Sequence, residues 1–105
     1  MIYSTTETIP GRDVAAILGV VTGNIVQSKH IGKDIMAGLQ TLVGGEVEGY
    51  TEMLSEARNE AIKRLEAEAK AKGADAVVNI RFTTSSIMDG SSEILAYGTA
   101  VKLAP

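Results

Sequence analysis

The sequence contains no cysteine and no tryptophan, and it has a single histidine among its 105 residues. Without cysteine the chain cannot form disulfides, use a thiol in catalysis, or bind zinc or iron–sulfur clusters through thiolates. The longest uninterrupted apolar run, VAAILGVV, covers only residues 14–21, whereas a membrane-spanning helix needs about 20 such residues. The first residues also lack the basic and then apolar plan of a signal peptide. The sequence therefore predicts a cytoplasmic protein with no membrane partner.

Basic charge and aromatic side chains are scarce as well. The formal net charge is −3, and the aromatic residues are Tyr3, Tyr50, Phe82 and Tyr97. A protein that binds nucleic acid needs a basic surface for the phosphates and usually aromatic rings for the bases. Five of the ten basic residues instead lie among acids on one predicted helix. The composition thus argues against a nucleic-acid partner and predicts a core made of Val, Ile, Leu and Ala.

The apolar pattern predicts a single α+β domain over residues 1–105. After a short extended start and a turn at Pro10-Gly11, we expect a strand at 14–28, a short helix at 35–43, a long helix at 49–72, and two strands at 74–84 and 93–103. Met88-Asp89-Gly90 lies in the turn of a loose hairpin between the last two strands. The order β-α-α-β-β is typical of helices packed on one face of an antiparallel or mixed sheet.

The helix at 49–72 has the clearest pattern. Its apolar stripe consists of Tyr50, Met53, Leu54, Ala57, Ala61, Leu65 and Ala69. An acid precedes a base by four positions in the pairs Glu60–Arg64, Glu66–Lys70 and Glu68–Lys72. Each such pair stabilises a helix by about 0.3 kcal/mol. Gly73 favours the left-handed conformation that ends a helix, so we expect the helix to stop there.

Strict alternation along each strand predicts which side chains share a face of the sheet. In the first long strand, Ile17, Val21 and Ile25 would face one side and Leu18, Val20 and Val26 the other, with a bend or bulge near Gly19 or Gly23. In the second, Val78, Ile80 and Phe82 would face one side and Val77, Asn79, Arg81 and Thr83 the other. In the third, Ala96, Gly98 and Ala100 would let a helix pack closely, opposite Leu95, Tyr97, Val101 and Leu103.

The apolar residues on the face without helices predict self-association. Two helices cover only one face of a sheet, and a large exposed apolar patch usually marks an interface. We therefore expect a homo-oligomer closed by rotation, in which copies cover one another's faces and strand edges. The alternative is that the N-terminal segment folds over this face within one copy.

The stretch LVGGEVEGYTEML, which begins at residue 42, is the one glycine-rich stretch that resembles a phosphate-binding loop. A P-loop requires GxxxxGK[ST], in which the lysine and the hydroxyl complete the phosphate and magnesium contacts. This stretch has Glu46, Glu48 and Glu52 instead, whose charge repels phosphate, and a predicted helix rather than a strand leads into it. We interpret Gly44-Gly45 as a turn between helices.

Three residues are candidates for contact with a ligand: His30, Asn79 and Arg81. His30 lies between Lys29 and Lys33, which oppose a bound cation, so a metal site would need several copies of His30 around an oligomer axis. The alternative is a solvated loop histidine. Arg81 is costly to bury without a partner, so it either meets a carboxylate across a subunit boundary or lines a polar cavity with Asn79.

The carboxylates at Glu52, Glu56 and Glu60 follow one another at intervals of four residues on the long helix. Paired carboxylates can serve acid–base or metal chemistry. On the polar face of a charged helix, however, we interpret them as solvated surface. No catalytic residue and no metal ligand is predicted within one chain, and no cofactor is indicated.

Several segments together resemble the YbjQ-like family of small bacterial and archaeal proteins, often labelled “putative heavy-metal-binding”. They are TTETIPGRDV, LGVVTGNIV, KDIMAGLQTLVGGEVEGYTEML, EARNEAIKRLEAEAKAKGADAVVNIRF and YGTAVKL, and they cover nearly the whole chain. The resemblance implies a dodecin-like α+β subunit and a ring-shaped homopentamer, and it implies no enzyme activity. Acidic residues often follow GADAVV in the family, whereas this chain has Asn79 and Arg81 there, which argues against a carboxylate metal site on this strand.

Two functional hypotheses follow. In the first, the protein is a non-enzymatic ring that binds a small ligand or a metal at subunit boundaries or along its axis. In the second, the ring is a structural module that presents a surface to another protein and binds no ligand. The first hypothesis predicts a polar cavity lined by His30, Asn79 or Arg81, and the second predicts that these groups are solvated or paired internally.

Overall fold

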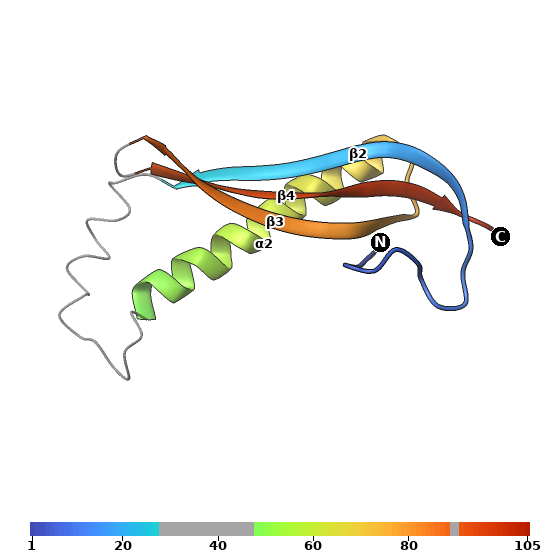
Figure 1. The fold of residues 1–105 in the computed structure, drawn as a ribbon, viewed down its shortest axis with the longest axis horizontal. Helices are drawn as coiled ribbons and strands as arrows, with labels where there is room; N and C mark the ends of the chain where they lie inside the picture. Colours follow the sequence, from blue (N-terminus) through green and yellow to red (C-terminus); the bar gives the residue numbers. More distant parts are fainter. Residues whose placement is uncertain (28–47, 89–90) are drawn as a thin grey trace.

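The computed structural model describes residues 1–27, 48–88 and 91–105. These form β1 (Ile2–Tyr3), β2 (Val14–Gln27), α2 (Glu48–Ala71), β3 (Ala76–Met88) and β4 (Ser91–Leu103), arranged as one helix on a four-stranded sheet (Figure 1). The α+β class and the four long elements are therefore confirmed. The predicted short helix at 35–43, Gly44-Gly45 and His30 lie outside the described residues.

The sheet has the strand order β1-β3-β4-β2. β1 pairs in parallel with the start of β3, at Ala76 and Val77, while β3–β4 and β4–β2 are antiparallel. β3 and β4 form the expected hairpin, and β2 pairs with β4 along nearly its whole length. β2 thus forms one edge of the sheet, and β1 together with the part of β3 beyond β1 forms the other.

The core lies between α2 and one face of the sheet, which we call the helix face. Ala57, Ala61, Leu65 and Ala69 of α2 are all buried there, together with Ala96 and Ala100 of β4. Small residues on both sides allow a close approach, as the sequence predicts. The approach is closest at Gly23, where a Cβ would collide with the carbonyl oxygen of Ala61 and the backbone nitrogen of Leu65.

A bulge in β2 changes the faces predicted for its first half. The register with β4 shifts between Ile17 and Gly19, and Gly19 has a φ of 127°. An extra residue in a strand reverses the alternation of the side chains that follow. As a result Leu18 packs with Val21 against the helix, and Ile17 lies on the opposite face, the outer face. The predicted bulge near Gly19 is confirmed, but the prediction that Ile17 shares a face with Val21 is wrong.

A second bulge, in β3, has the same effect. Val78 pairs with Thr99 and Arg81 pairs with Tyr97. Asn79 and Ile80 therefore lie opposite the single residue Gly98, and Asn79 has a φ of 55°. Val77 and Ile80 consequently belong to the core under the helix, whereas Val78 belongs to a smaller cluster on the outer face. The prediction that Val78 and Ile80 share a face is therefore wrong.

The N-terminal segment, residues 1–13, covers one end of the outer face. The Ser4 nitrogen donates a hydrogen bond to the Val77 carbonyl oxygen, and the Ile80 nitrogen donates one to the Ser4 carbonyl oxygen, both at 3.0 Å. Ile9 packs on a cluster formed by Ala76, Val78, Val101 and Leu103. The alternative prediction, that the N-terminal segment covers this face within one copy, is therefore confirmed for this end of the face. Farther along, Val20 is 68% exposed and Val26 is 52% exposed.

Two side chains of α2 satisfy backbone groups on the free edge of β2. The Arg64 guanidinium donates a hydrogen bond to the carbonyl oxygen of Asn24 at 2.6 Å, and a Glu68 carboxylate oxygen accepts one from the Thr22 nitrogen at 3.3 Å. The predicted ion pairs Glu60–Arg64 and Glu66–Lys70 are confirmed, at 3.3 and 3.1 Å. Glu68 contacts β2 in place of the predicted Lys72. Charged side chains along an edge hinder its pairing with another strand.

The end of α2 follows the sequence prediction. Gly73 has a φ of 78°, and the Ala74 nitrogen donates to the carbonyl oxygen of Ala69 at 3.0 Å, as in a Schellman motif. No helix among the described residues is long and apolar enough to span a membrane. The chain measures 54 × 28 × 17 Å with a radius of gyration of 16.9 Å, whereas a compact domain of this length has about 13 Å.

Candidate functional site

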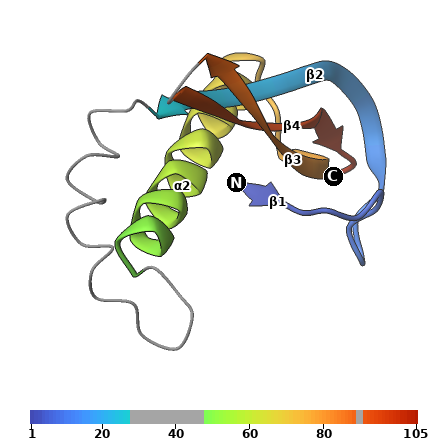
Figure 2. The same cartoon turned by 60° about the vertical axis from the view of Figure 1, so that its left-hand side comes forward.

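The site begins with a tight turn in the N-terminal segment. The Arg12 nitrogen donates to the Ile9 carbonyl oxygen at 3.1 Å, and Gly11 has a φ of 79°. Proline is common at the second position of a type II turn, and the positive φ at the third position favours glycine. The predicted turn at Pro10-Gly11 is therefore confirmed. It lets the segment leave β3, pass along the outer face and enter β2 (Figure 2).

A hollow of about 530 Å³ lies between this segment and the outer face of the sheet. Its lining combines an apolar floor with a polar rim: Ile9, Val14, Ile17, Val78 and Val101 are apolar, and Glu7, Thr8, Gly11, Arg12, Asp13, Asn79 and Thr99 complete the wall. Small-molecule sites have volumes of about 300–1,000 Å³ and similar mixtures of apolar walls and a few polar groups. The hollow therefore has the size and the lining of a small-ligand site.

Asn79 enters the wall because of the bulge in β3. Its φ of 55° is rare for residues other than glycine, although asparagine tolerates it better than most. The backbone nitrogen of Asn79 donates to the Thr6 carbonyl oxygen at 3.0 Å, which ties the segment to the sheet. Asn79 lines the hollow together with Thr99, the partner of Val78 across the ladder. The bulge thus supplies both a tether for the segment and a polar group in the wall.

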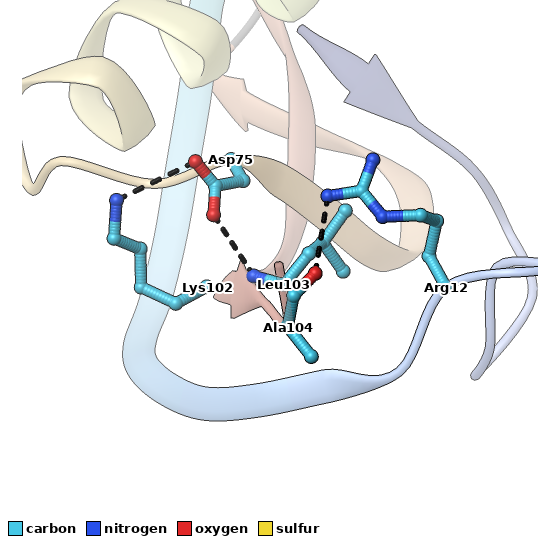
Figure 3. Close-up of polar contacts among 5 residues, drawn as sticks. All are labelled: Arg12, Asp75, Lys102, Leu103 and Ala104. Atoms are coloured by element: carbon cyan, nitrogen blue, oxygen red, sulfur yellow. Dashed lines mark hydrogen bonds and ion pairs between the residues drawn. The ribbon is translucent and has the colours of Figure 1, made fainter.

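The Arg12 side chain is directed toward the end of β4 (Figure 3). Its guanidinium donates to the carbonyl oxygen of Ala104 at 3.4 Å, close to Asp75. Asp75 accepts a hydrogen bond of 2.9 Å from the Leu103 nitrogen and pairs with Lys102 at 3.4 Å. The bond from Leu103 lowers the pKa of Asp75 against a smaller opposing effect of burial, and the charges of Lys102 and Arg12 lower the pKa further.

Of the two predicted site residues that the structure describes, one lies at the hollow. Asn79 lines it, and His30 lies outside the described residues. Arg81 is exposed and donates to the carbonyl oxygens of Thr5 at 2.8 Å and Ile80 at 2.9 Å. Arg81 therefore fastens the N-terminal segment. In the described part of the chain it has no carboxylate partner.

Sequence reasoning missed Glu7, Asp13 and Thr99, which line the hollow. The only local signal was the pair of acids on either side of the Pro10-Gly11 turn. Across residues 1–27, 48–88 and 91–105, no three His, Cys, Asp or Glu side chains are placed to hold a metal ion. Glu52 and Glu56 are exposed on α2, as the interpretation of a solvated surface requires, whereas Glu60 is half-buried and pairs with Arg64.

Comparison with known proteins identifies the family. The family model of the YbjQ proteins, described as “Putative heavy-metal-binding”, matches residues 1–104. The chain belongs to this family. It is 75% identical over 105 residues to a UPF0145 protein of Shewanella frigidimarina, covering 100% of this chain and 98% of that protein. It is 65% identical over 103 residues to a UPF0145 protein of the archaeon Archaeoglobus fulgidus, covering 98% and 95% of the two chains.

A solved structure supports the fold of this YbjQ-family chain. The structure is a protein with unknown function of the DUF74 family from Pediococcus pentosaceus, with a TM-score of 0.68. The likeness covers 99% of this chain and 98% of the other at 17% sequence identity. At that identity the likeness extends to the fold alone, so the site has to be argued from the residues of this chain.

Proposed function

We propose that this YbjQ-family protein is a non-enzymatic homo-oligomer that binds a small ligand or a metal ion at the boundary between copies. The observation that carries the proposal is that the hollow is open to solvent on the side lined by Ile17. Ile17 lines the hollow and is nevertheless 73% exposed. A neighbouring copy packed over Ile17 would close that side and place the bound ligand between two subunits.

The exposed apolar side chains of the outer face support the oligomer. Ile17, Val20 and Val26 are more than half exposed along β2, and Tyr97 is 39% exposed on β4. Leaving such residues in water costs about 25 cal/mol per Å² of apolar surface. Because Arg64 and Glu68 occupy the edge of β2 at Asn24 and Thr22, we expect copies to meet through the outer face. A ring of five copies is the assembly that the family resemblance implies.

A substitution that fills the hollow tests the ligand part of the proposal. Thr99→Phe places a ring in the hollow, and Thr83→Phe places the same ring on β3 outside it, where Thr83 pairs with Leu95. Native mass spectrometry of protein without a histidine tag should show extra mass retained on the oligomer. This mass should be kept in Thr83→Phe and lost in Thr99→Phe.

A second function, that of a protein-interaction module, is favoured by the edge of β3. All residues from Arg81 to Met88 are exposed, and no described segment pairs with their outer side. An open edge of this kind can accept a strand from a partner protein. Oligomers that carry no extra mass and respond identically in both phenylalanine variants would favour this module over the ligand-binding oligomer.

A further inference from the structure

The charges around the hollow are unbalanced. The acidic residues Glu7 and Asp13 line it, and Arg12 is the one basic residue among the residues that line it. The Arg12 guanidinium is bonded to the Ala104 carbonyl oxygen and lies close enough to Asp75 to lower the pKa of that carboxyl. The Arg12 guanidinium is therefore directed toward the end of β4, and the lining carries two carboxylates against one guanidinium.

The carboxylates of Glu7 and Asp13 have no cationic partner in the described part of the chain. The ion pairs found there join Arg64 to Glu60, Lys70 to Glu66 and Lys102 to Asp75. Asp13 uses its backbone carbonyl oxygen to accept a hydrogen bond from the Ala104 nitrogen at 2.8 Å, which positions the residue without engaging its carboxylate. A cation entering the hollow would thus meet carboxylates that no other described residue neutralises.

The apolar lining of the hollow indicates an organic cation and not a bare metal ion. Val14 and Ile17, which are 39% and 73% exposed, offer apolar contact area, which a metal ion does not use. A hard divalent cation is held by oxygen ligands, with waters often completing its shell, and it gains nothing from apolar walls. An alkyl or aryl body, by contrast, gains from apolar burial. The Asn79 amide oxygen and the Thr99 hydroxyl can accept hydrogen bonds from an N–H group.

The geometry points to a small organic cation, an ammonium or amidinium group on a short apolar body, as the class of ligand that the hollow binds. This assignment rests on the proposed ligand-binding function. The cationic group lies on the side lined by Glu7 and Asp13, and the apolar body lies on Val14 and Ile17. The net charge of −3 on the chain also favours approach of a cation over an anion.

Three probes of equal length and different charge test the assignment: n-hexylamine, n-hexanol and n-hexanoate. Exposed ion pairs contribute up to about 1 kcal/mol, so isothermal titration calorimetry of the intact protein should show hexylamine binding about fivefold tighter than hexanol. Hexanoate should bind more weakly than hexanol. The advantage of hexylamine should shrink at high salt, because salt screens charges at an exposed rim.

Paired variants show whether these carboxylates cause the preference. The double variant Glu7→Gln, Asp13→Asn should bind hexylamine and hexanol equally and retain the affinity of the parent for hexanol. The control Glu52→Gln, Glu56→Gln makes the same change in net charge on the exposed surface of α2 and should keep the fivefold preference.

Several results would overturn the assignment. These are equal binding of the three probes, tighter binding of hexanoate, a preference that survives in the Glu7→Gln, Asp13→Asn variant, and no binding of any probe. Zinc ions alone displacing hexylamine from the parent protein and not from that variant would assign the carboxylates to a metal. If the three probes bound equally to the parent and none bound to Thr99→Phe, the assignment of a cationic ligand would be wrong. The proposed ligand-binding function would still hold.

Discussion

The two faces of the sheet are built on different plans. The helix face is complete within one copy, because alanines of α2 meet Gly23, Ala96 and Ala100 at close range and bury Leu65 fully. Among the residues that the structure describes, the outer face is covered at one end only, by Ile9 of the N-terminal segment, and Val20 is exposed to solvent. The difference indicates that the helix face supplies the stability of the fold and that the outer face is available for ligands and for other copies.

The largest expected effect tests the helix face. Gly23→Ala places a methyl group against the backbone of Ala61 and Leu65, which cannot yield as a flexible side chain can. We expect a loss of about 3 kcal/mol or more in the free energy of unfolding, or failure to fold. Ala15→Val adds two methyl groups at an exposed position of the same strand and should change the stability by less than about 0.5 kcal/mol.

Denaturant unfolding of both variants and the parent measures this contrast. If Gly23→Ala were as stable as the parent, the helix would not depend on close contact with β2. The two faces would then differ less than their packing indicates.

A smaller effect is expected at the bulge on the outer side. Asn79→Val forces a β-branched residue into the left-handed region and should cost about 1–2 kcal/mol. Asn79→Gly, which adopts this conformation freely, should stay within about 0.5 kcal/mol of the parent. Thermal unfolding of the two variants provides the comparison. Equal losses in both would mean that the amide side chain, and not the backbone conformation, stabilises the bulge.

The smallest effect concerns Asp75, which joins the start of β3 to the end of β4. The pKa of Asp75 is lower in the folded chain than its ordinary value of 3.8, so its carboxylate contributes fully to stability above pH 3.8. This contribution is lost as the pH falls through the lower folded pKa. The melting temperature of Asp75→Asn should therefore lie below that of the parent at neutral pH and approach it in acid.

Melting curves from neutral pH to below pH 3.8 test this prediction, with the exposed Glu52→Gln as a control that shows no such convergence. A difference in melting temperature between Asp75→Asn and the parent that stays constant down to the lowest pH would contradict the role assigned to the Leu103 hydrogen bond.

Much of the fold could be predicted because its signals are local. The apolar stripe of α2 and Gly73 after it predicted a helix at residues 49–72, and the structure has it at 48–71. The strand predicted at 14–28 ends at Gln27. The small residues of β4 correctly indicated the side on which the helix packs. These patterns repeat along one element and depend little on the rest of the chain.

The face assignments in β2 and β3 failed because a bulge shifts the alternation by one residue. Gly19 was a recognisable candidate, whereas Asn79 resembles any other strand position until its φ is known. The hollow could not be predicted from the sequence either. It depends on pairing between Ser4 and β3 across more than seventy positions, and no local pattern encodes that contact.

The central claim is that one copy leaves its outer face unfinished, so that copies cover one another. Sedimentation velocity at low micromolar concentration tests this directly on the parent and on Val20→Asp, with Ala67→Asp on the exposed side of α2 as the control. We expect an oligomer for the parent and for Ala67→Asp, and a smaller species for Val20→Asp. A folded single copy of the parent, stable and free of aggregation, would contradict the claim.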